Sequence, residues 1–297
     1  MPEPHPMQRS IAERDLILVT GKGGVGKSTV VSALARIAAA RRGGAVAVEF
    51  SAHPRLPGLA NGTGHIELCN IELESALPRA LGRMLKVPAI LGAALNNRVL
   101  RLFVRTSPAV MEMIILDEIY TLVEQHAPKG HPVIVDLPAS GHAVSLLDTP
   151  RSVRRMLRVG PVAEKAKVIE RLLLDRDRSE LVVVALPEEL PVNETIELVQ
   201  RADDAGLRTR TVVVNQVPNQ TVAEEDRQLL GIMQQGGDAN MAQVADLAQG
   251  ELDGADQVRA QIERLRDAVS GPVIEVPLSA ELKPARRADA VARALAP

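Results

Sequence analysis

The sequence predicts an α/β fold in which a doubly wound, mostly parallel sheet carries an inserted helical subdomain. Short runs of aliphatic residues recur along the chain, and most are apolar at consecutive positions, as in strands buried on both faces. Helical patterns separate these runs, and such strand–helix alternation is typical of a doubly wound sheet. The 297 residues suffice for a single large domain over 1–297.

Composition and charge exclude several classes of function. The net charge of −2 gives the molecule no general attraction for nucleic acid or anionic membranes. Residues 1–15 lack the apolar core of a secretory signal. No run approaches the roughly 18 apolar residues of a membrane-spanning helix. These features predict a cytoplasmic protein with no nucleic-acid partner.

The elements follow in order from short sequence patterns. Six strands are expected, at 16–20, 45–49, 133–136, 181–186, 211–214 and 273–276. A further strand is expected near Cys69, in HIELCNIELES. A helix is expected over 28–40, because its aliphatic residues fall on one face and Gly43 can end it.

Three stretches interrupt the alternation. Residues 77–127 and 151–178 are long, helix-like and strandless, and we expect them to form the inserted subdomain. Residues 219–268, rich in Gln, Asp and Glu, predict a helical excursion on the surface. Ser107-Pro108 favours a helix start. The helix that follows is apolar on nearly every side, which fits either a buried helix or a Met-rich surface for a client helix.

The stretch 16–31, LILVTGKGGVGKSTVV, contains the pattern G-x-x-x-x-G-K-[ST]. Glycines let the backbone wrap around a phosphate chain, and the next helix offers its positive end to the same anion. Lys27 is expected to reach the β and γ phosphates, and the Ser28 hydroxyl to ligate Mg²⁺. The predicted phosphate-binding residues are Gly21, Lys22, Gly23, Gly24, Val25, Gly26, Lys27, Ser28 and Thr29.

Lys22 is a second lysine that the phosphate-binding pattern does not require. It follows the first glycine, at the rim of the loop, where its ammonium could meet a nucleotide held by a second subunit. A solvated surface lysine explains the residue equally well.

Several motifs together resemble one family. GKGGVGKST is similar to the signature of deviant phosphate-loop ATPases that dimerise around nucleotide, a group that includes ParA/MinD positioning ATPases, the nitrogenase iron protein and ArsA-like ATPases. VDLPASGHAVSLL at 135–147 resembles the second switch of the ArsA-like family. ALPEELPVNETIELVQ at 185–200, VVVNQVP at 212–218 and PLSAEL at 277–282 resemble further motifs of that family, in the same order.

The resemblance implies a Mg²⁺-dependent ATPase that converts ATP to ADP and phosphate. Asp136 ends a strand, where a carboxylate can hold Mg²⁺ directly or through water. Gly141-His142 would sense the γ-phosphate. Asn215 would face the edge of adenine, and Pro277 would help to close the base pocket.

The family also implies a nucleotide-gated dimer. The partner subunit would be a second copy or a paralogue, and the dimer would bind and release a protein client that the sequence does not identify. A transient membrane-protein client fits this scheme. Lys22, Lys27, Asp136 and Glu49 are the candidate catalytic residues.

The first switch departs from the family pattern D-P-A-H. The corresponding stretch, VEFSAHPRL at 48–56, retains Ala52-His53 but has Phe50 in place of the aspartate. Glu49 could substitute for that aspartate, hydrogen-bond the waters of a metal ion, or be a strand-terminal charge. The missing aspartate therefore affects the expected rate of ATP hydrolysis but not the expected binding of nucleotide.

Two alternatives stay open beside an active ATPase. One is a pseudo-ATPase, a nucleotide-locked subunit paired with an active paralogue. The other is a ParA/MinD-type positioning protein, for which the C-terminal ARRADAVARALAP is a weak candidate for a membrane helix.

Cysteine usage excludes thiol-based metal chemistry. Arsenite, a shared zinc ion and an iron–sulfur cluster all need several thiolates, and Cys69 is alone in the chain. We therefore expect neither zinc nor arsenite binding.

Overall fold

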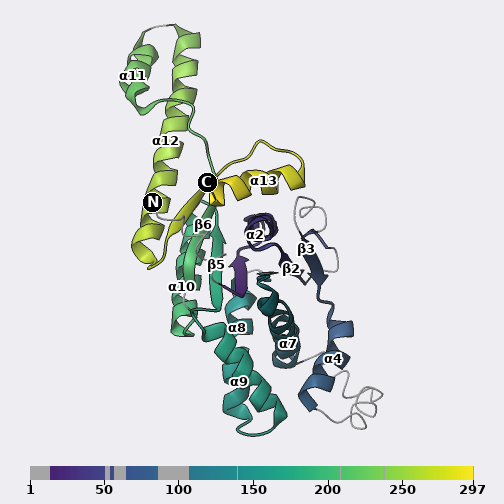
Figure 1. Ribbon diagram of the computed structural model, residues 1–297. Helices are drawn as coiled ribbons and strands as arrows, with labels where there is room; N and C mark the ends of the chain where they lie inside the picture. Colours follow the sequence, from purple (N-terminus) through teal and green to yellow (C-terminus); the bar gives the residue numbers. More distant parts are fainter. Residues whose placement is uncertain are drawn as a thin grey trace.

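A computed structural model gives the fold, and the structure describes residues 14–50, 54–56, 65–85, 107–138, 140–207, 209–236 and 238–296 (Figure 1). The strands are β1 (Leu16–Gly21), β2 (Ala45–Glu49), β3 (Ile66–Asn70), β4 (Val133–Asp136), β5 (Ser179–Ala185), β6 (Thr209–Val217) and β7 (Val273–Pro277). They form one seven-stranded sheet in the order β3-β2-β4-β1-β5-β6-β7, and every pairing is parallel. The predicted α/β class and the six expected strands are confirmed.

The strands form where the sequence is continuously aliphatic, because both faces of the sheet are covered. Every residue of β1, β2 and β5 is buried. The strand near Cys69 is β3, and as an edge strand it is only partly buried. It accordingly mixes apolar and polar residues rather than forming an aliphatic run.

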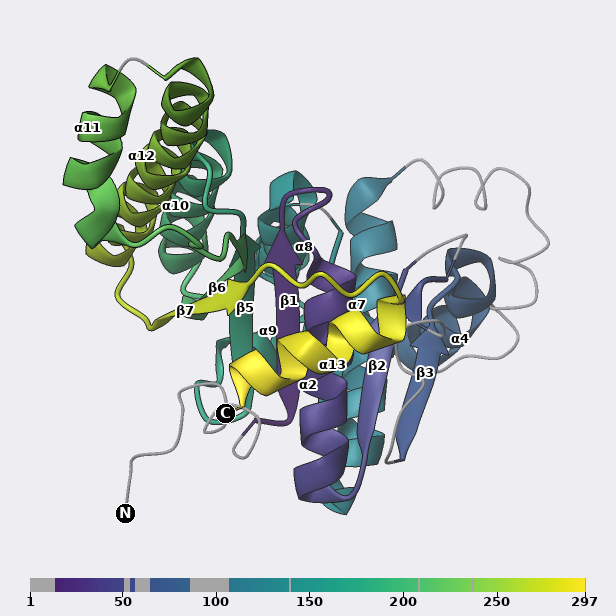
Figure 2. The same ribbon diagram turned by 90° about the horizontal axis from the view of Figure 1, so that it is seen from above.

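Helices cover the two faces of the sheet unequally. The helices are α2 (Lys27–Arg42), α4 (Leu73–Leu85), α7 (Pro108–His126), α8 (Ser140–Met156), α9 (Pro161–Leu174), α10 (Glu189–Asp204), α11 (Arg227–Gln235), α12 (Ala239–Ala268) and α13 (Pro284–Leu295), with short 3-10 turns η1 (Ala127–Lys129) and η2 (Glu224–Asp226). Figure 2 shows α2 and α13 in front of the sheet and α7, α8 and α9 behind it. None of the described helices is both long and apolar enough to cross a membrane.

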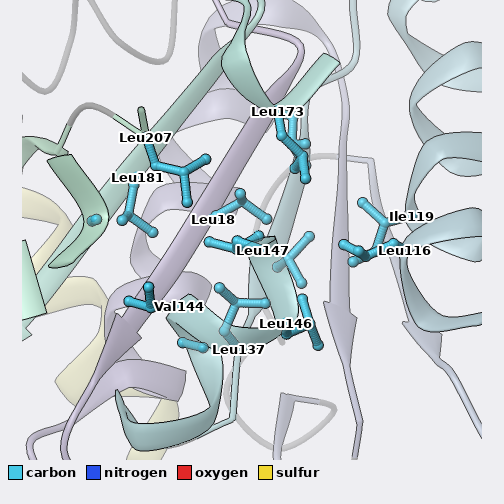
Figure 3. Close-up of a cluster of buried hydrophobic side chains, with 14 of the residues drawn as sticks. Leu18, Leu116, Ile119, Leu137, Val144, Leu146, Leu147, Leu173, Leu181 and Leu207 are labelled. Atoms are coloured by element: carbon cyan, nitrogen blue, oxygen red, sulfur yellow. The ribbon is translucent and has the colours of Figure 1, made fainter. Parts of the chain in front are cut away.

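The larger core lies between the sheet and the helices behind it. Figure 3 shows its centre, where Leu18 and Leu181 of the sheet meet leucines from α8 and α9, with Leu116 and Ile119 of α7 alongside. The smaller core, between the sheet and α2, also contains Val291 and Leu295 of α13. The apolar side of α13 is therefore packed against the protein itself.

The described residues of the three interrupting stretches are mostly helical, and none of them belongs to a strand. The 77–127 stretch includes most of α4 and all of α7, but its residues 86–106 lie outside the described residues. The 219–268 stretch forms η2, α11 and α12, a helical hairpin that projects from the β6–β7 side of the sheet in Figure 1.

Helix α7 begins at Pro108 with Ser107 at its N-cap position, as the sequence predicts. It contributes Met113, Ile114 and six further buried residues to the helical layer. Of the two interpretations of this helix, burial describes its central turns. Met111 and Ile115 are half-buried.

A buried carboxylate ties α7 to its neighbours. Asp117 has no exposed surface, and its Oδ2 accepts a hydrogen bond from Nε of Arg83 on α4 at 2.7 Å. Its Oδ1 lies 2.8 Å from Nζ of Lys165 on α9, and that ammonium is also 4.5 Å from the ring centre of Tyr120. One side chain of α7 thereby joins α4 and α9.

Candidate functional site

The phosphate loop connects β1 to α2, and its backbone requires glycine at two positions. Gly21 has φ of 146°, and a Cβ there would lie 2.2 Å from the Val184 carbonyl oxygen of β5. Gly26 has φ of 96°, and a Cβ there would lie 2.3 Å from the side-chain nitrogen of Asn215. The loop therefore lies against the ends of β5 and β6, closer than any larger residue would allow.

Asn215 stabilises this loop through a hydrogen bond to its backbone. Its side chain is buried, and Nδ2 donates a hydrogen bond to the Val25 carbonyl oxygen at 2.8 Å. Pro277 lies at the end of the neighbouring strand, where it pairs with Val217. Both residues predicted to contact the base thus lie at adjacent strand ends on one side of the loop, and their contact with adenine stays a prediction.

Lys27, Ser28 and Asp136 come together at the carboxyl ends of β1 and β4. The Ser28 Oγ donates a hydrogen bond to Asp136 Oδ2 at 2.5 Å. The Lys27 Nζ donates to the Lys22 carbonyl oxygen at 3.0 Å, so the ammonium spans the loop. In open parallel sheets, ligands bind outside the carboxyl ends of the strands, at the point where the strand order reverses.

A pocket of about 210 Å³ opens in front of these side chains. Its lining consists of Lys27, Ser28, Glu49, Phe50, Arg55, Asp136, Leu137 and Pro138. Burial raises the pKa of the Asp136 carboxyl, although the Ser28 hydrogen bond and the Lys27 charge oppose the rise. Burial lowers the pKa of the Lys27 ammonium, and the Asp136 charge opposes that shift. A bound cation and a bound anion would relieve these two desolvation costs.

The donor set of the pocket fits Mg²⁺. Mg²⁺ prefers oxygen ligands and is often held by one or two protein oxygens together with substrate phosphates. The Ser28 hydroxyl and the Asp136 carboxylate are two such oxygens, and they are already within hydrogen-bond distance of each other. These are the residues that would hold the ion.

Glu49 is at the end of β2, 6% exposed, and it lines the same pocket. Its Oε2 accepts hydrogen bonds from the backbone N–H groups of Arg55, at 2.9 Å, and Leu56, at 3.4 Å. Phe50 is half-buried and packs against the larger core. Glu49 is thus the carboxylate that the pocket offers near the position of the missing aspartate, and one of its oxygens holds the following segment.

Lys22 contacts its own chain in this structure. Its Nζ lies 2.6 Å from Oε1 of Glu194 on α10, and both side chains are more than one-third exposed. Sequence reasoning did not predict this ion pair, although Glu194 belongs to the family-like stretch 185–200.

Some residues from the sequence argument fall outside this geometry. Ala52-His53 lies outside the described residues. The backbone of Gly141-His142 belongs to the first turn of α8, shortly after Asp136. Arg55, in contrast, lines the pocket and was missed. The sequence could have indicated Arg55, because it lies within the stretch 48–56 that corresponds to the first switch of the family.

Comparison with known proteins finds that the chain is similar to several ATPases. A family model described as anion-transporting ATPase matches residues 159–249. The chain is 26% identical over 296 aligned residues to ATPase BagA of Mycobacterium tuberculosis, covering 88% of this chain and 86% of that protein.

Two kinds of arsenical pump protein are also similar. A putative arsenical pump-driving ATPase 2 of Aquifex aeolicus is 25% identical over 238 residues, covering 66% of this chain and 78% of that protein. An arsenical pump-driving ATPase of Escherichia coli is 28% identical over 209 residues, covering 68% of this chain and 35% of that protein. Together with the all-parallel sheet and the loop between β1 and α2, these similarities support a relationship between this chain and the ArsA-like ATPases.

Proposed function

We propose that this protein is a Mg²⁺-dependent ATPase that hydrolyses ATP to ADP and phosphate and works as a nucleotide-gated dimer. The observation that carries the proposal is the meeting of Lys27, Ser28 and Asp136 in one pocket at the end of β1. These residues lie on two elements, α2 and β4, and a glycine-rich loop adjoins them. That combination serves phosphoryl transfer, in which the protein mainly positions and neutralises charge.

Each side chain has a separate task in this proposal. The Lys27 ammonium would leave the Lys22 carbonyl and bind the terminal phosphates of the nucleotide. Ser28 and Asp136 would hold Mg²⁺, which supplies charge neutralisation on the phosphate oxygens. Asn215 would keep the loop in its binding conformation through Val25. Glu49 is the carboxylate nearest to the place of the first-switch aspartate.

Hydrolysis by the chain alone tests this function. A purified sample that releases phosphate from ATP in a Mg²⁺-dependent manner, and that loses the activity in the Asp136→Asn variant, would support the proposal. A sample that binds Mg-ATP but releases no phosphate would favour the second candidate, a nucleotide-locked subunit paired with an active paralogue. Phe50 in place of the switch aspartate is the observation in favour of that candidate.

Dimerisation requires Lys22 to change partner. Its pair with Glu194 is exposed, and exposed ion pairs contribute only about 0–1 kcal/mol. The ammonium can therefore leave Glu194 at little cost and turn to a triphosphate on the partner subunit. The dimer would then close with ATP and reopen after hydrolysis, when the extra charge has gone.

Two substitutions test the change of partner. Lys22→Ala should leave nucleotide binding by the isolated subunit intact, yet weaken ATP-dependent dimerisation and suppress hydrolysis. Glu194→Gln should instead strengthen dimerisation, up to about fivefold, because it removes the competing carboxylate. Sedimentation with Mg²⁺ and a non-hydrolysable ATP analogue measures both effects.

Glu197→Gln is the matched control, because Glu197 is exposed on the same helix, one turn beyond Glu194. We expect it to sediment like the wild type. If Lys22→Ala dimerises and hydrolyses ATP normally, Lys22 is a surface lysine. The proposal that Lys22 contacts the nucleotide of the partner subunit is then wrong.

A client of this dimer would be a protein, bound and released as the subunits move. Helix α7 packs mainly into the helical layer, so client contacts would come from its half-buried residues such as Met111 or from neighbouring surface. The partner subunit would be a second copy or a paralogue.

A further inference from the structure

Arg55 is the second cationic side chain of the site pocket. It lines that pocket together with Lys27, Glu49 and Asp136. Arg55 lies six residues after the end of β2, whereas Lys27 is the first residue of α2. Among the described residues, no carboxylate forms an ion pair with the Arg55 guanidinium. The exposed guanidinium therefore has no carboxylate partner within the described residues, and it is available to an anionic ligand.

The position of Arg55 is fixed by contacts on both sides. The Glu49 carboxylate accepts the backbone N–H of Arg55 at 2.9 Å. The next residue, Leu56, is 1% exposed and belongs to the core beneath α2. A carboxylate from β2 and an apolar anchor therefore hold the segment that carries the guanidinium.

We infer that Arg55 is an intramolecular ligand of the terminal phosphate of the bound nucleotide, and that Glu49 is its positioning residue. This inference rests on the proposed nucleotide-binding function and names the residue that would distinguish a triphosphate from a diphosphate. Lys27 spans the phosphate loop, so it would contact the β and γ phosphates from the loop side. Arg55 approaches from the end of β2, beside Asp136, where the phosphate farthest from the loop would lie.

The chemistry of the pocket favours this assignment over an ordinary surface arginine. Glu49 and Asp136 bring two negatively charged carboxylates into one pocket, and their mutual repulsion costs energy. A guanidinium opposite them reduces that cost before ligand binds, and a planar fork can contact two oxygens of one phosphoryl group. In this role the Glu49 carboxylate positions Arg55 and does not need to position the attacking water.

Nucleotide selectivity tests the inference directly. We expect Arg55→Ala to bind a non-hydrolysable Mg-ATP analogue at least about tenfold more weakly, as for a lost charge-assisted hydrogen bond, and Mg-ADP within about twofold of wild type. Arg55→Lys should give an intermediate loss, because it keeps the charge and loses the fork. Arg41→Ala, on the exposed end of α2, is the matched control and should bind both nucleotides normally.

The positioning role of Glu49 needs a double-mutant comparison. If Glu49 acts through Arg55, Glu49→Ala should lower the preference for the ATP analogue over ADP. The double variant should then show the same preference as Arg55→Ala alone. If the two losses in preference add, Glu49 acts independently of Arg55 and the positioning role is wrong.

The outcomes separate this inference from the proposed function. If the wild type binds neither nucleotide, the proposed function fails and the inference fails with it. If the wild type binds both nucleotides and Arg55→Ala retains its affinity for the ATP analogue, only the inference is overturned. Equal weakening of ATP analogue and ADP also overturns it, because the contact would then not be with the terminal phosphate. Melting temperatures without nucleotide check that each variant is folded.

Discussion

Replacing Lys27 by alanine should reduce the affinity for Mg-ATP by at least about a hundredfold while the protein remains folded. The Lys27 ammonium donates a hydrogen bond to the Lys22 carbonyl oxygen within the same loop, so the fold loses little when the side chain is removed. Bound nucleotide would lose a charged donor from its phosphates, and charged hydrogen bonds contribute about 1.5–3 kcal/mol each. Loss of the ammonium also removes one of the two positive charges that compensate the half-buried Asp136, which further opposes the binding of an anion.

Calorimetric titration measures this effect, with thermal unfolding as the check on folding. Lys167→Ala is a suitable control, because Lys167 is a partly exposed lysine on α9, away from the pocket. We expect the control to bind like the wild type. An unchanged affinity in Lys27→Ala would mean that the loop does not bind phosphate in the proposed way.

Replacing Asp117 by alanine should lower the free energy of unfolding by about 3–5 kcal/mol. The substitution leaves Arg83 and Lys165 without their shared carboxylate, and removal of one partner from a buried ion pair costs about this amount. Glu118 still pairs with Arg83 after the change, whereas Lys165 has no second carboxylate partner within the described part of the chain. The junction of α4, α7 and α9 should therefore loosen first.

Urea unfolding of the wild type and the variants measures the loss. Asp117→Asn keeps the volume and one acceptor oxygen, so it should lose less stability than Asp117→Ala. Glu124→Gln removes an exposed partner of Arg178 from the same helix and should change stability by at most about 1 kcal/mol. A loss below about 1 kcal/mol in Asp117→Ala would contradict the structural role given to this carboxylate.

The strands and the phosphate loop could be predicted because local sequence specifies them. A strand buried on both faces must be apolar at successive positions, so the runs at 16–20 and 181–186 stand out without any partner strand. A loop that wraps an anion needs glycines and a following helix, and residues 21–28 supply both in one stretch. The sequence pattern of β3 was harder to recognise, because an edge strand is half-exposed and therefore contains both apolar and polar residues.

Helix α7 was ambiguous for a related reason. Its composition is apolar on nearly every side, and such a helix satisfies either a core or a client surface. Only the positions of α4, α8 and α9 around it decide which side chains are covered. The buried Asp117 was not predicted at all, since a charged residue in a sequence does not reveal the two cations that will surround it.

The sequence by itself determined the fold class, the loop that begins the site, and Asp136 as a candidate metal ligand. The tertiary structure decided which distant groups meet that loop. Ser28 and Asp136 are 108 residues apart in the chain, Lys22 and Glu194 are 172 apart, and Val25 and Asn215 are 190 apart. Each of these contacts exists because β4, β5 and β6 lie beside or near β1 in the sheet, in an order different from their order in the sequence. Local propensity carries no information about that order, which is set by how the whole chain buries its apolar faces.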